Sequence, residues 1–304
     1  TLGSRSVAIG VAALGDQNNT TATDVYNVAV GHGAGTAVTT ATRSVLIGGL
    51  SGDALTTGSR NHVIGYNALG ADTLGARATA LGYGALQTQN FTTATENYNV
   101  ALGYNAGGSV TTGIHNTLLG ALAGDGLQDA DRNIAIGYQA LTEDDLGSRT
   151  VAIGAGAVFS QNYATATDSH NVSIGDLSLF YNVTGVNNTF VGSAAGLGAS
   201  GNSHSNNTGI GKSALGAITT GANNVAVGSL AGDAITSADF NIAIGGQALG
   251  GNVLGGNSVA VGHAALLVQN PATATDMYNV AVGHAAGLNV TTGDQNNLIG
   301  GLAG

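Results

Sequence analysis

One short pattern recurs along the whole chain and limits its fold more than any other feature. It consists of an aliphatic residue, most often alanine, a second aliphatic residue, glycine, two variable residues and alanine, as in Val7–Ala13 and Ile134–Ala140. The pattern occurs 17 times, and its glycines are 17, 19 or 21 residues apart. A short period of this kind is typical of solenoids, in which stacked units share one core.

The glycine of each repeat, here called its anchor glycine, is interpreted as a structural position at which the chain bends. The anchor glycines are Gly10, Gly31, Gly48, Gly65, Gly82, Gly103, Gly120, Gly137, Gly154, Gly175, Gly192, Gly211, Gly228, Gly245, Gly262, Gly283 and Gly300. Because the repeat covers the chain, we expect one β-solenoid domain over residues 1–304. The repeat pattern is open at both ends, which indicates a segment of a longer fibrous protein.

Composition excludes several classes of protein. The chain has no cysteine, and therefore neither disulfides nor thiolate metal sites. Its formal net charge of −10 disfavours binding to nucleic acid or to an anionic membrane. It also contains no apolar run long enough to span a bilayer and no signal-peptide pattern, so no membrane insertion is expected in this segment.

The arginines follow the repeat as well. All six lie five residues before an anchor glycine, at Arg5, Arg43, Arg60, Arg77, Arg132 and Arg149.

The residues around each anchor alternate with the period of a β-strand. The residue before the anchor is always Ile, Val or Leu, and the residue three before it is mostly Val or Ile. This alternation predicts a strand with the large aliphatic residues in the core and the intervening residue on the opposite face. Alanine three residues after the anchor, followed by Leu or Gly, predicts a second short strand in each coil.

These patterns predict an all-β fold, a parallel β-solenoid (β-roll) of about 16 coils. Most coils have 17 residues, and 21-residue coils recur periodically. At one strand spacing per coil the solenoid is expected to be about 75–80 Å long. A coil this thin buries little apolar surface by itself, and its outward alanines lead us to expect that other copies complete the burial in a homotrimeric rod.

Asparagine occupies the position four before the anchor in 12 coils. Stacked asparagines one strand spacing apart can form hydrogen-bonded ladders, and asparagine also tolerates turns. We favour this structural role over the alternative, a row of asparagines that binds a ligand.

Four larger coils share a second signature, at Gln17–Asp24, Gln89–Glu96, Gln161–Asp168 and Gln269–Asp276. Insertions in solenoids form loops on one face, which is often the binding face. The loops differ at their third residue, which makes Asn19, Phe91, Tyr163 and Pro271 possible contact residues for a glycan or protein partner. The alternative is a bulged strand extension in which the aromatic side chain packs locally.

No catalytic, cofactor-binding or metal site is predicted, because nearly every polar residue is a repeat position. The acidic groups Asp125/Asp129/Asp131 and Glu143/Asp144/Asp145 could hold Ca²⁺, but solvated turns explain them better. His32, His263 and His284 directly follow anchors, where other coils have tyrosine, which indicates a surface or interface ladder. A metal bound by such histidines at a threefold axis is the less favoured alternative. An enzyme is therefore not expected.

The repeats resemble the head repeats of YadA-like trimeric autotransporter adhesins. The adhesin motif Asn/Ser-Val-Ala-Ile-Gly-x-x-Ala is matched at residues 6–13, 27–34, 133–140 and 258–265. The Thr-Thr-Gly turns at residues 56–58, 111–113 and 291–293 are also similar to repeats of phage tail fibres. The resemblance implies parallel β-rolls assembled as homotrimers, located outside the cell, at the cell surface or on a virion.

The sequence therefore predicts a structural and adhesive fibre segment that presents loops for attachment to a surface or receptor, as part of a bacterial adhesin or a phage tail fibre. Its expected partners are copies of itself and a host glycan or protein receptor. One alternative is a subunit of a self-assembling extracellular filament or sheath. A less favoured alternative is an ice-binding solenoid, because the threonine pairs do not occur in every coil.

Overall fold

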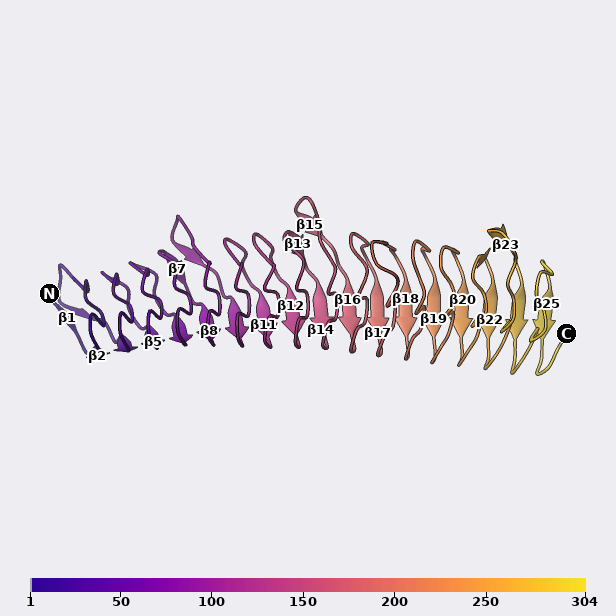
Figure 1. Ribbon diagram of the computed structural model, residues 1–304, viewed down its shortest axis with the longest axis horizontal. Helices are drawn as coiled ribbons and strands as arrows, with labels where there is room; N and C mark the ends of the chain where they lie inside the picture. Colours follow the sequence, from indigo (N-terminus) through magenta and orange to yellow (C-terminus); the bar gives the residue numbers. More distant parts are fainter. Residues whose placement is uncertain (1) are drawn as a thin grey trace. The chain divides into compact units, whose positions relative to one another are not determined.

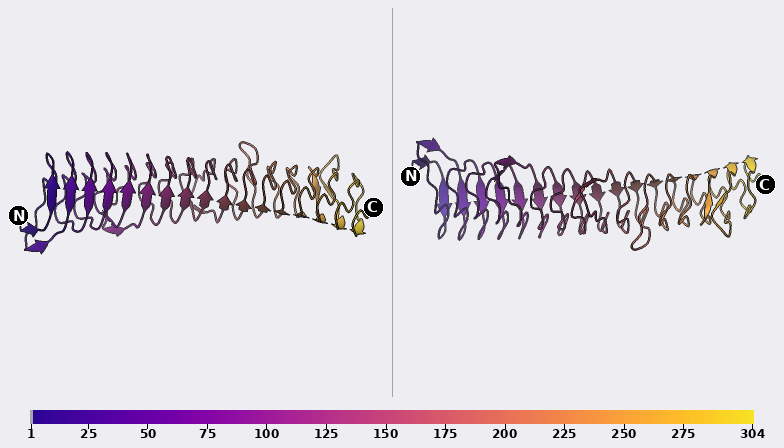
Figure 2. Two further views of the ribbon diagram at one scale, coloured as in Figure 1. Left: turned by 90° about the horizontal axis from the view of Figure 1, so that it is seen from below. Right: turned by 90° about the horizontal axis from the view of Figure 1, so that it is seen from above.

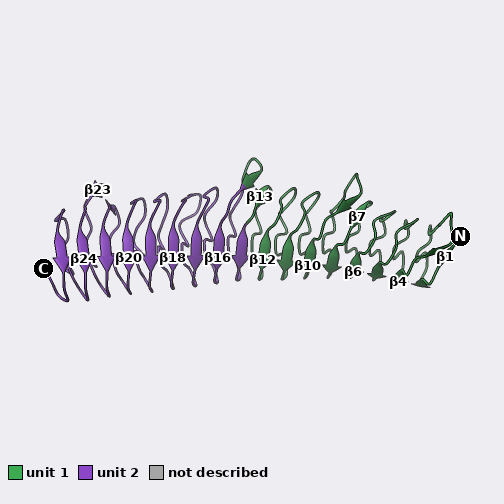
Figure 3. Cartoon of the chain, turned by 180° about the vertical axis from the view of Figure 1, so that it is seen from behind, with its two compact units in different colours: residues 1–149, 163–167 green, residues 150–162, 168–304 purple. Residues whose placement is uncertain are grey.

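The computed structural model describes residues 2–304, and these contain only β-strands and turns. No helix within this range has the length and apolar character needed to cross a membrane. Contacts divide the chain into two compact units (Figure 3). Unit 1 comprises the residues up to Arg149 together with Tyr163–Thr167, and unit 2 comprises Thr150–Asn162 and Asp168–Gly304.

Each unit contains one three-residue strand per coil, which makes about 17 coils in the chain. The strands of unit 1 are β2 (Val7–Ile9), β4 (Val28–Val30), β5 (Val45–Ile47), β6 (His62–Ile64), β8 (Thr79–Leu81), β10 (Val100–Leu102), β11 (Thr117–Leu119) and β12 (Ile134–Ile136). Those of unit 2 are β14 (Val151–Ile153), β16 (Val172–Ile174), β17 (Thr189–Val191), β18 (Thr208–Ile210), β19 (Val225–Val227), β20 (Ile242–Ile244), β22 (Val259–Val261), β24 (Val280–Val282) and β25 (Asn297–Ile299).

Within each unit, successive three-residue strands pair in parallel and in register with the repeat (Figure 1). Ala101 pairs with Leu118 in unit 1, and Ala226 pairs with Ala243 in unit 2. Figure 2 shows from two further sides that the strands of a unit follow one another at the same place in each coil. Each repeat position therefore forms a column along its unit, and the predicted parallel β-solenoid is confirmed.

The larger coils are associated with short additional strands of two residues each. These are β1 (Gly3–Ser4), β3 (Thr23–Asp24), β7 (Gly75–Ala76), β9 (Thr95–Glu96), β13 (Gly147–Ser148), β15 (Thr167–Asp168), β21 (Gly255–Gly256) and β23 (Thr275–Asp276). Parallel pairs join β1 to β3, β7 to β9 and β21 to β23. The extra four residues therefore extend the strand pairing locally instead of forming unstructured loops.

The anchor glycines occupy a conformation that other residues rarely adopt. All 17 have φ between +123° and +146°. In the middle of a unit they also leave no room for a side chain, because a Cβ on Gly103 would lie 2.4 Å from the carbonyl oxygen of Gly120. Both backbone conformation and close approach of the next coil therefore require glycine.

The predicted orientation of the strands is wrong. Between the first and last coils the middle residue of each three-residue strand is buried in the core, so that Ala101 and Leu118 are fully buried, whereas Ile64 and Leu102 are more than 40% exposed. Alternation indicates that the two faces of a strand differ, but it does not say which face is inside. The interior of the coil also holds buried residues from after the anchor, such as Leu55 and Leu127, and the strand adds its mostly small middle residue to them.

The second predicted strand is also absent from the described coils. Residues after the anchor form successive tight turns, in which Gly15 N–H donates to the Ala12 carbonyl and Gln17 N–H to that of Leu14. Ala12 and Leu14 have left-handed conformations, with φ of 58° and 50°. Such alternation of conformation is incompatible with an extended strand.

Large and small residues compensate for each other inside the coils. Leu46, Leu118 and Phe190 are large residues in the middle of a strand, and each has glycine four residues after its anchor. Coils with alanine in the strand often have leucine there instead, as in Ala135 with Leu141. A Cβ on Gly124 would lie 2.7 Å from Leu118 Cδ2, so the glycine provides the volume that the leucine fills.

The asparagine column forms a buried hydrogen-bond ladder. In unit 2, Asn241 N–H donates to Asn224 Oδ1 at 2.9 Å, and Asn224 Nδ2 donates to the Ala238 carbonyl at 2.8 Å. The same arrangement links Asn99, Asn116 and the Gly113 carbonyl in unit 1. The structural role expected for the asparagines is therefore confirmed, although most of the bonds join a side chain to the backbone.

Candidate functional site: an exposed aliphatic face and two side-chain columns

The outer face of the three-residue strands carries the large aliphatic residues of the repeat. We define the aliphatic face of each unit as the columns one and three residues before the anchors. Neither column contains Asp, Glu, Lys or Arg in any coil. Ile64, Leu102, Ile210 and Ile244 are between 39% and 46% exposed. Contiguous exposed apolar surface of this kind marks an interaction site, because soluble proteins seldom leave it open to water.

Beside the aliphatic face lies a column formed by the residue that follows each anchor. In unit 1 the rings of Tyr66, Tyr83 and Tyr104 stack in sequence, with centroids 5.6 Å apart, and all three are more than half exposed. In unit 2, His263 and His284 stack at 5.4 Å. The predicted surface ladder of tyrosine and histidine is confirmed.

A second column, here called the arginine column, contains the residue five before each anchor. In unit 1 it contains all six arginines of the chain, and the remaining coils there carry Tyr26, Tyr98 and His115. Backbone bonds fix its register, since Arg60 N–H donates to the Thr42 carbonyl and Arg77 N–H to the Ser59 carbonyl. Every arginine in the column has a left-handed backbone, with φ between 57° and 66°.

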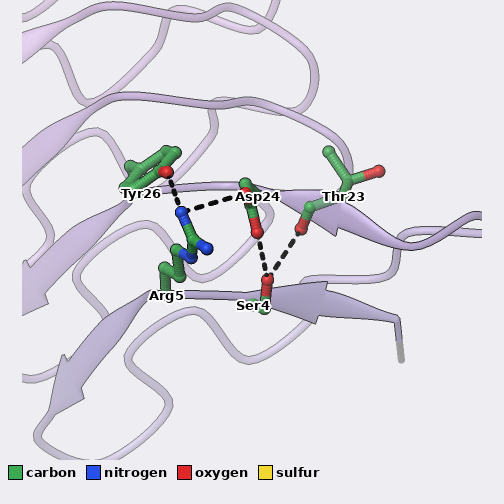
Figure 4. A network of polar contacts seen from close by, with 5 residues as sticks. All are labelled: Ser4, Arg5, Thr23, Asp24 and Tyr26. Carbon is green, nitrogen blue, oxygen red and sulfur yellow. Dashed lines mark hydrogen bonds and ion pairs between the residues drawn. The ribbon is translucent and has the colours of Figure 1, made fainter.

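At the first larger coil an arginine is held by an exposed polar network (Figure 4). Arg5 forms an ion pair of 3.1 Å with Asp24 and donates to the Tyr26 hydroxyl, while its guanidinium lies over the Tyr26 ring. Ser4 Oγ donates to Asp24 at 2.8 Å. The carboxylate and the ring thus fix the direction of one guanidinium.

The second larger coil repeats this network with equivalent residues. Arg77 pairs with Glu96 at 2.8 Å and lies over the Tyr98 ring, whose other neighbour is the stacked ring of His115. The Tyr98 hydroxyl donates to Glu96, and this bond lowers the pKa of Glu96, with further lowering by the charges of Arg77 and Arg60. Arginine charges therefore act together along this column.

The four predicted contact residues are not exposed. Asn19, Phe91 and Tyr163 are each only 5% exposed, and Pro271 is also buried. An exposed residue at this position is therefore ruled out and the alternative of local packing is supported, because the third loop residue packs inward while Thr92, Thr93 and Ala94 face solvent. Hydrogen bonds also hold the backbone of Phe91 in place. Its N–H lies 3.4 Å from Asp72 Oδ1, and its carbonyl accepts from the Thr73 hydroxyl.

In the acidic turns, three of the carboxylates each accept a hydrogen bond from a different group of the chain. Asp129 accepts from the Thr112 hydroxyl at 2.7 Å, Asp131 from the Ile114 N–H at 2.8 Å and Asp144 from the Gly147 N–H at 3.0 Å. Over residues 2–304, no group of three or more His, Asp or Glu side chains is arranged to hold a metal ion.

One buried titratable residue was not singled out from the sequence. His204 lies in the 19-residue coil of unit 2, edge-on to Phe190 with ring centroids 5.5 Å apart, and is 2% exposed. Burial lowers the pKa of His204 from 6.5 to about 4. The signal in the sequence is that the 17-residue coils have Gly or Ala at the equivalent position, seven before the anchor.

Acid is expected to destabilise unit 2 through His204. The folded state holds the neutral ring, so the unfolded state takes up the proton first and stability falls as the pH drops from about 6.5 towards 4. At pH 4.5 the loss is about 2–3 kcal/mol relative to neutral pH. Urea unfolding of the wild type and of His204→Leu at both pH values measures it. The carboxyl groups titrate in both proteins, so an equal pH dependence in the two would contradict the assignment to His204.

Comparison of this chain with protein-family models, with curated proteins and with solved structures found no match.

Proposed function

We propose that this chain is a structural and adhesive β-solenoid segment that assembles with copies of itself through the aliphatic face. The observation that carries the proposal is that large aliphatic side chains lie exposed or half-buried on the outer face in coil after coil of each unit, with no charged residue in their two columns. Burial of this surface is worth about 25 cal/mol for each Å² removed from water, so even part of the face favours association.

The repeat itself indicates what covers the face. A partner that packs along the whole of a unit must match its period of one strand spacing, about 4.8 Å. A second copy of the same chain has the same repeat and therefore the same period. Homo-oligomers with closed symmetry are also the commonest protein assemblies. The resemblance to trimeric adhesin heads favours three copies.

A homotrimer of this kind suits an extracellular role, at a cell surface or on a virion, as in a bacterial adhesin or a phage tail fibre. Parallel backbone ladders and buried asparagine ladders provide stiffness along each unit. The columns outside the aliphatic face stay free for attachment to a glycan or protein receptor. The repeated arrangement of the polar residues favours binding and support over catalysis.

The proposal is tested by the mass of the protein in solution. Sedimentation at micromolar concentration is expected to give about three times the chain mass of 29.5 kDa. Ile64→Lys combined with Leu102→Lys introduces charge at two exposed positions of the face and is expected to shift the protein to monomer while its circular dichroism spectrum is retained.

The matched control places the same residue on other exposed positions of unit 1. Thr57→Lys with Thr92→Lys adds two lysines outside the aliphatic face and is expected to leave the oligomer intact. A monomeric wild-type protein, or an oligomer that withstands both lysines in the face, would contradict the proposal.

A further inference from the structure

We infer that the arginine column of unit 1 is a binding site for a linear acidic polysaccharide, one that carries a carboxylate or sulfate on each sugar or on alternate sugars. The inference deepens the attachment role proposed above by naming the surface and the ligand class. It does not depend on the number of copies in the assembly.

The first argument is the concentration of positive charge. The chain has only seven Lys and Arg residues against 17 Asp and Glu. Six of these seven cations stand in a single column of one unit, and tyrosine or histidine fills the other described positions of that column in unit 1. The repeat explains why the arginines share one column, but it does not explain why the column is basic in unit 1 alone, and recognition of a linear anion requires such a line of cations.

The second argument is the backbone at this column. Arg43 and Arg60 have φ of 59° and 63°, in the left-handed region that asparagine tolerates and arginine seldom adopts. Unit 2 has asparagine at the same column in four coils, Asn187, Asn206, Asn223 and Asn257, with similar φ. The other coils of unit 2 have His170, Phe240, Tyr278 and Gln295 there, so the backbone of the column does not require arginine, and the arginines of unit 1 reflect a choice of side chain.

The third argument is that part of the charge is unbalanced. Arg5 and Arg77 have carboxylate partners, but Arg43 and Arg60 form no ion pair with any residue in the described range 2–304. Arg43, Arg60 and Arg77 occupy equivalent positions in three successive coils. Their backbones are therefore about one strand spacing, 4.8 Å, apart, and their guanidinium groups extend from neighbouring points of the column. Like charges directly opposite on neighbouring strands repel, and an anion lying along the column relieves that repulsion.

The chemistry of the column favours a polysaccharide over a nucleic acid. Single-stranded nucleic acids bind by stacking their bases on exposed aromatic faces. Here the Tyr98 ring is covered by Arg77 and by the stacked His115 ring, and Arg5 lies over Tyr26. What stays available is the guanidinium forks, which pair in a bidentate manner with carboxylate or sulfate oxygens. In an extended polysaccharide, each sugar lengthens the chain by about the distance between neighbouring coils. Successive anionic groups can therefore meet successive arginines.

The column is also distinct from the surface proposed for self-assembly. Each unit has its own aliphatic face, whereas the arginines occur in unit 1 alone. If the arginines served the contact between copies, which repeats along the chain, they would be expected in both units.

The experiment uses the full chain and fluorescein-labelled alginate oligosaccharide, a polyuronate, with a heparin-derived oligosaccharide as the sulfated arm. Binding is followed by fluorescence anisotropy at low and high salt, with neutral dextran and oligothymidylate as comparison ligands. The test variant is Arg43→Asn combined with Arg60→Asn, because asparagine is the residue that unit 2 accommodates at this column. The control Lys212→Asn with Ser229→Asp changes the net charge equally at exposed positions of unit 2.

We expect the wild type and the control to bind at least one acidic oligosaccharide in a salt-dependent manner, with dextran unbound. The two-arginine variant is expected to bind about tenfold more weakly while it keeps the circular dichroism spectrum and sedimentation behaviour of the wild type. The better of the two ligands then identifies uronate or sulfate as the recognised group. A wild type that is monomeric but binds with this arginine dependence would refute the assembly proposal and support the column.

Four results would overturn the inference. They are absence of binding to both acidic oligosaccharides, equal binding by the two-arginine variant, tighter arginine-dependent binding of oligothymidylate, and loss of the oligomer on arginine replacement. The third result would assign the column to nucleic acid, and the fourth to contacts between copies.

Discussion

Replacement of Gly103 by alanine is expected to lower the free energy of unfolding by about 4 kcal/mol or more. Two effects add at this anchor. Its φ of +146° is strained for any L-residue, and the new Cβ would lie 2.4 Å from the Gly120 carbonyl oxygen and 3.0 Å from the Ala121 nitrogen. Neither backbone atom can move without breaking the ladder that stacks the coils.

Gly300→Ala is the matched control for this prediction. Its φ of +123° is also strained, but no atom lies within 4 Å of the added Cβ, so only the conformational cost of about 1–3 kcal/mol remains. Urea unfolding followed by circular dichroism compares the two variants. Equal losses of stability would mean that close approach of the next coil does not explain the anchor glycines.

Leu118→Ala is expected to destabilise unit 1 by about 2–5 kcal/mol, and Gly124→Leu to restore much of that loss. Leu118 is fully buried and fills the space left by Gly107 and Gly124, so its truncation leaves a cavity. Gly124→Leu alone overpacks the same space, at a cost of about 1–3 kcal/mol. The double variant recreates the pairing of Ala135 with Leu141, and φ is already suitable, being 57° at Gly124 and 56° at Leu141.

A double-mutant cycle measures this compensation. Each single variant is expected to unfold at lower urea concentration than the wild type, and the double variant to unfold closer to the wild type than Leu118→Ala does. Additive losses in the double variant would show that the two positions do not share one volume. Leu55→Ala, which truncates a buried leucine in another coil of unit 1, provides a control that Gly124→Leu should not rescue.

The periodic features of the sequence predicted much of the fold. The spacing of the anchor glycines predicted stacked parallel coils, and the asparagine column predicted a hydrogen-bonded ladder, because both depend on equivalent residues meeting in successive coils. The tyrosine and histidine ladder was predicted for the same reason.

The candidate sites were predicted less well. Local packing of Phe91 and Tyr163 was one of two alternatives for the larger coils, and the sequence did not decide between them, since composition alone does not say which way a loop residue points. Burial of His204 depends on the irregular 19-residue coil around it. The arginines were seen to follow the repeat, but their left-handed backbone, their aromatic neighbours and their partition between the units needed coordinates.

The sequence by itself determined the register of the coils, because a period of this length allows each glycine to meet only its counterpart in the next coil. Only the tertiary structure decided which face of the strands is inside. Alternation of Val-Ala-Ile is the same seen from either side, and the choice depends on the space inside the coil. Buried residues after the anchor, such as Leu127, already occupy much of it, so the strand contributes its small middle residue, as at Ala101, or a larger one compensated by glycine, as at Leu118. The large aliphatic residues consequently lie outside, and they make this chain a candidate for assembly.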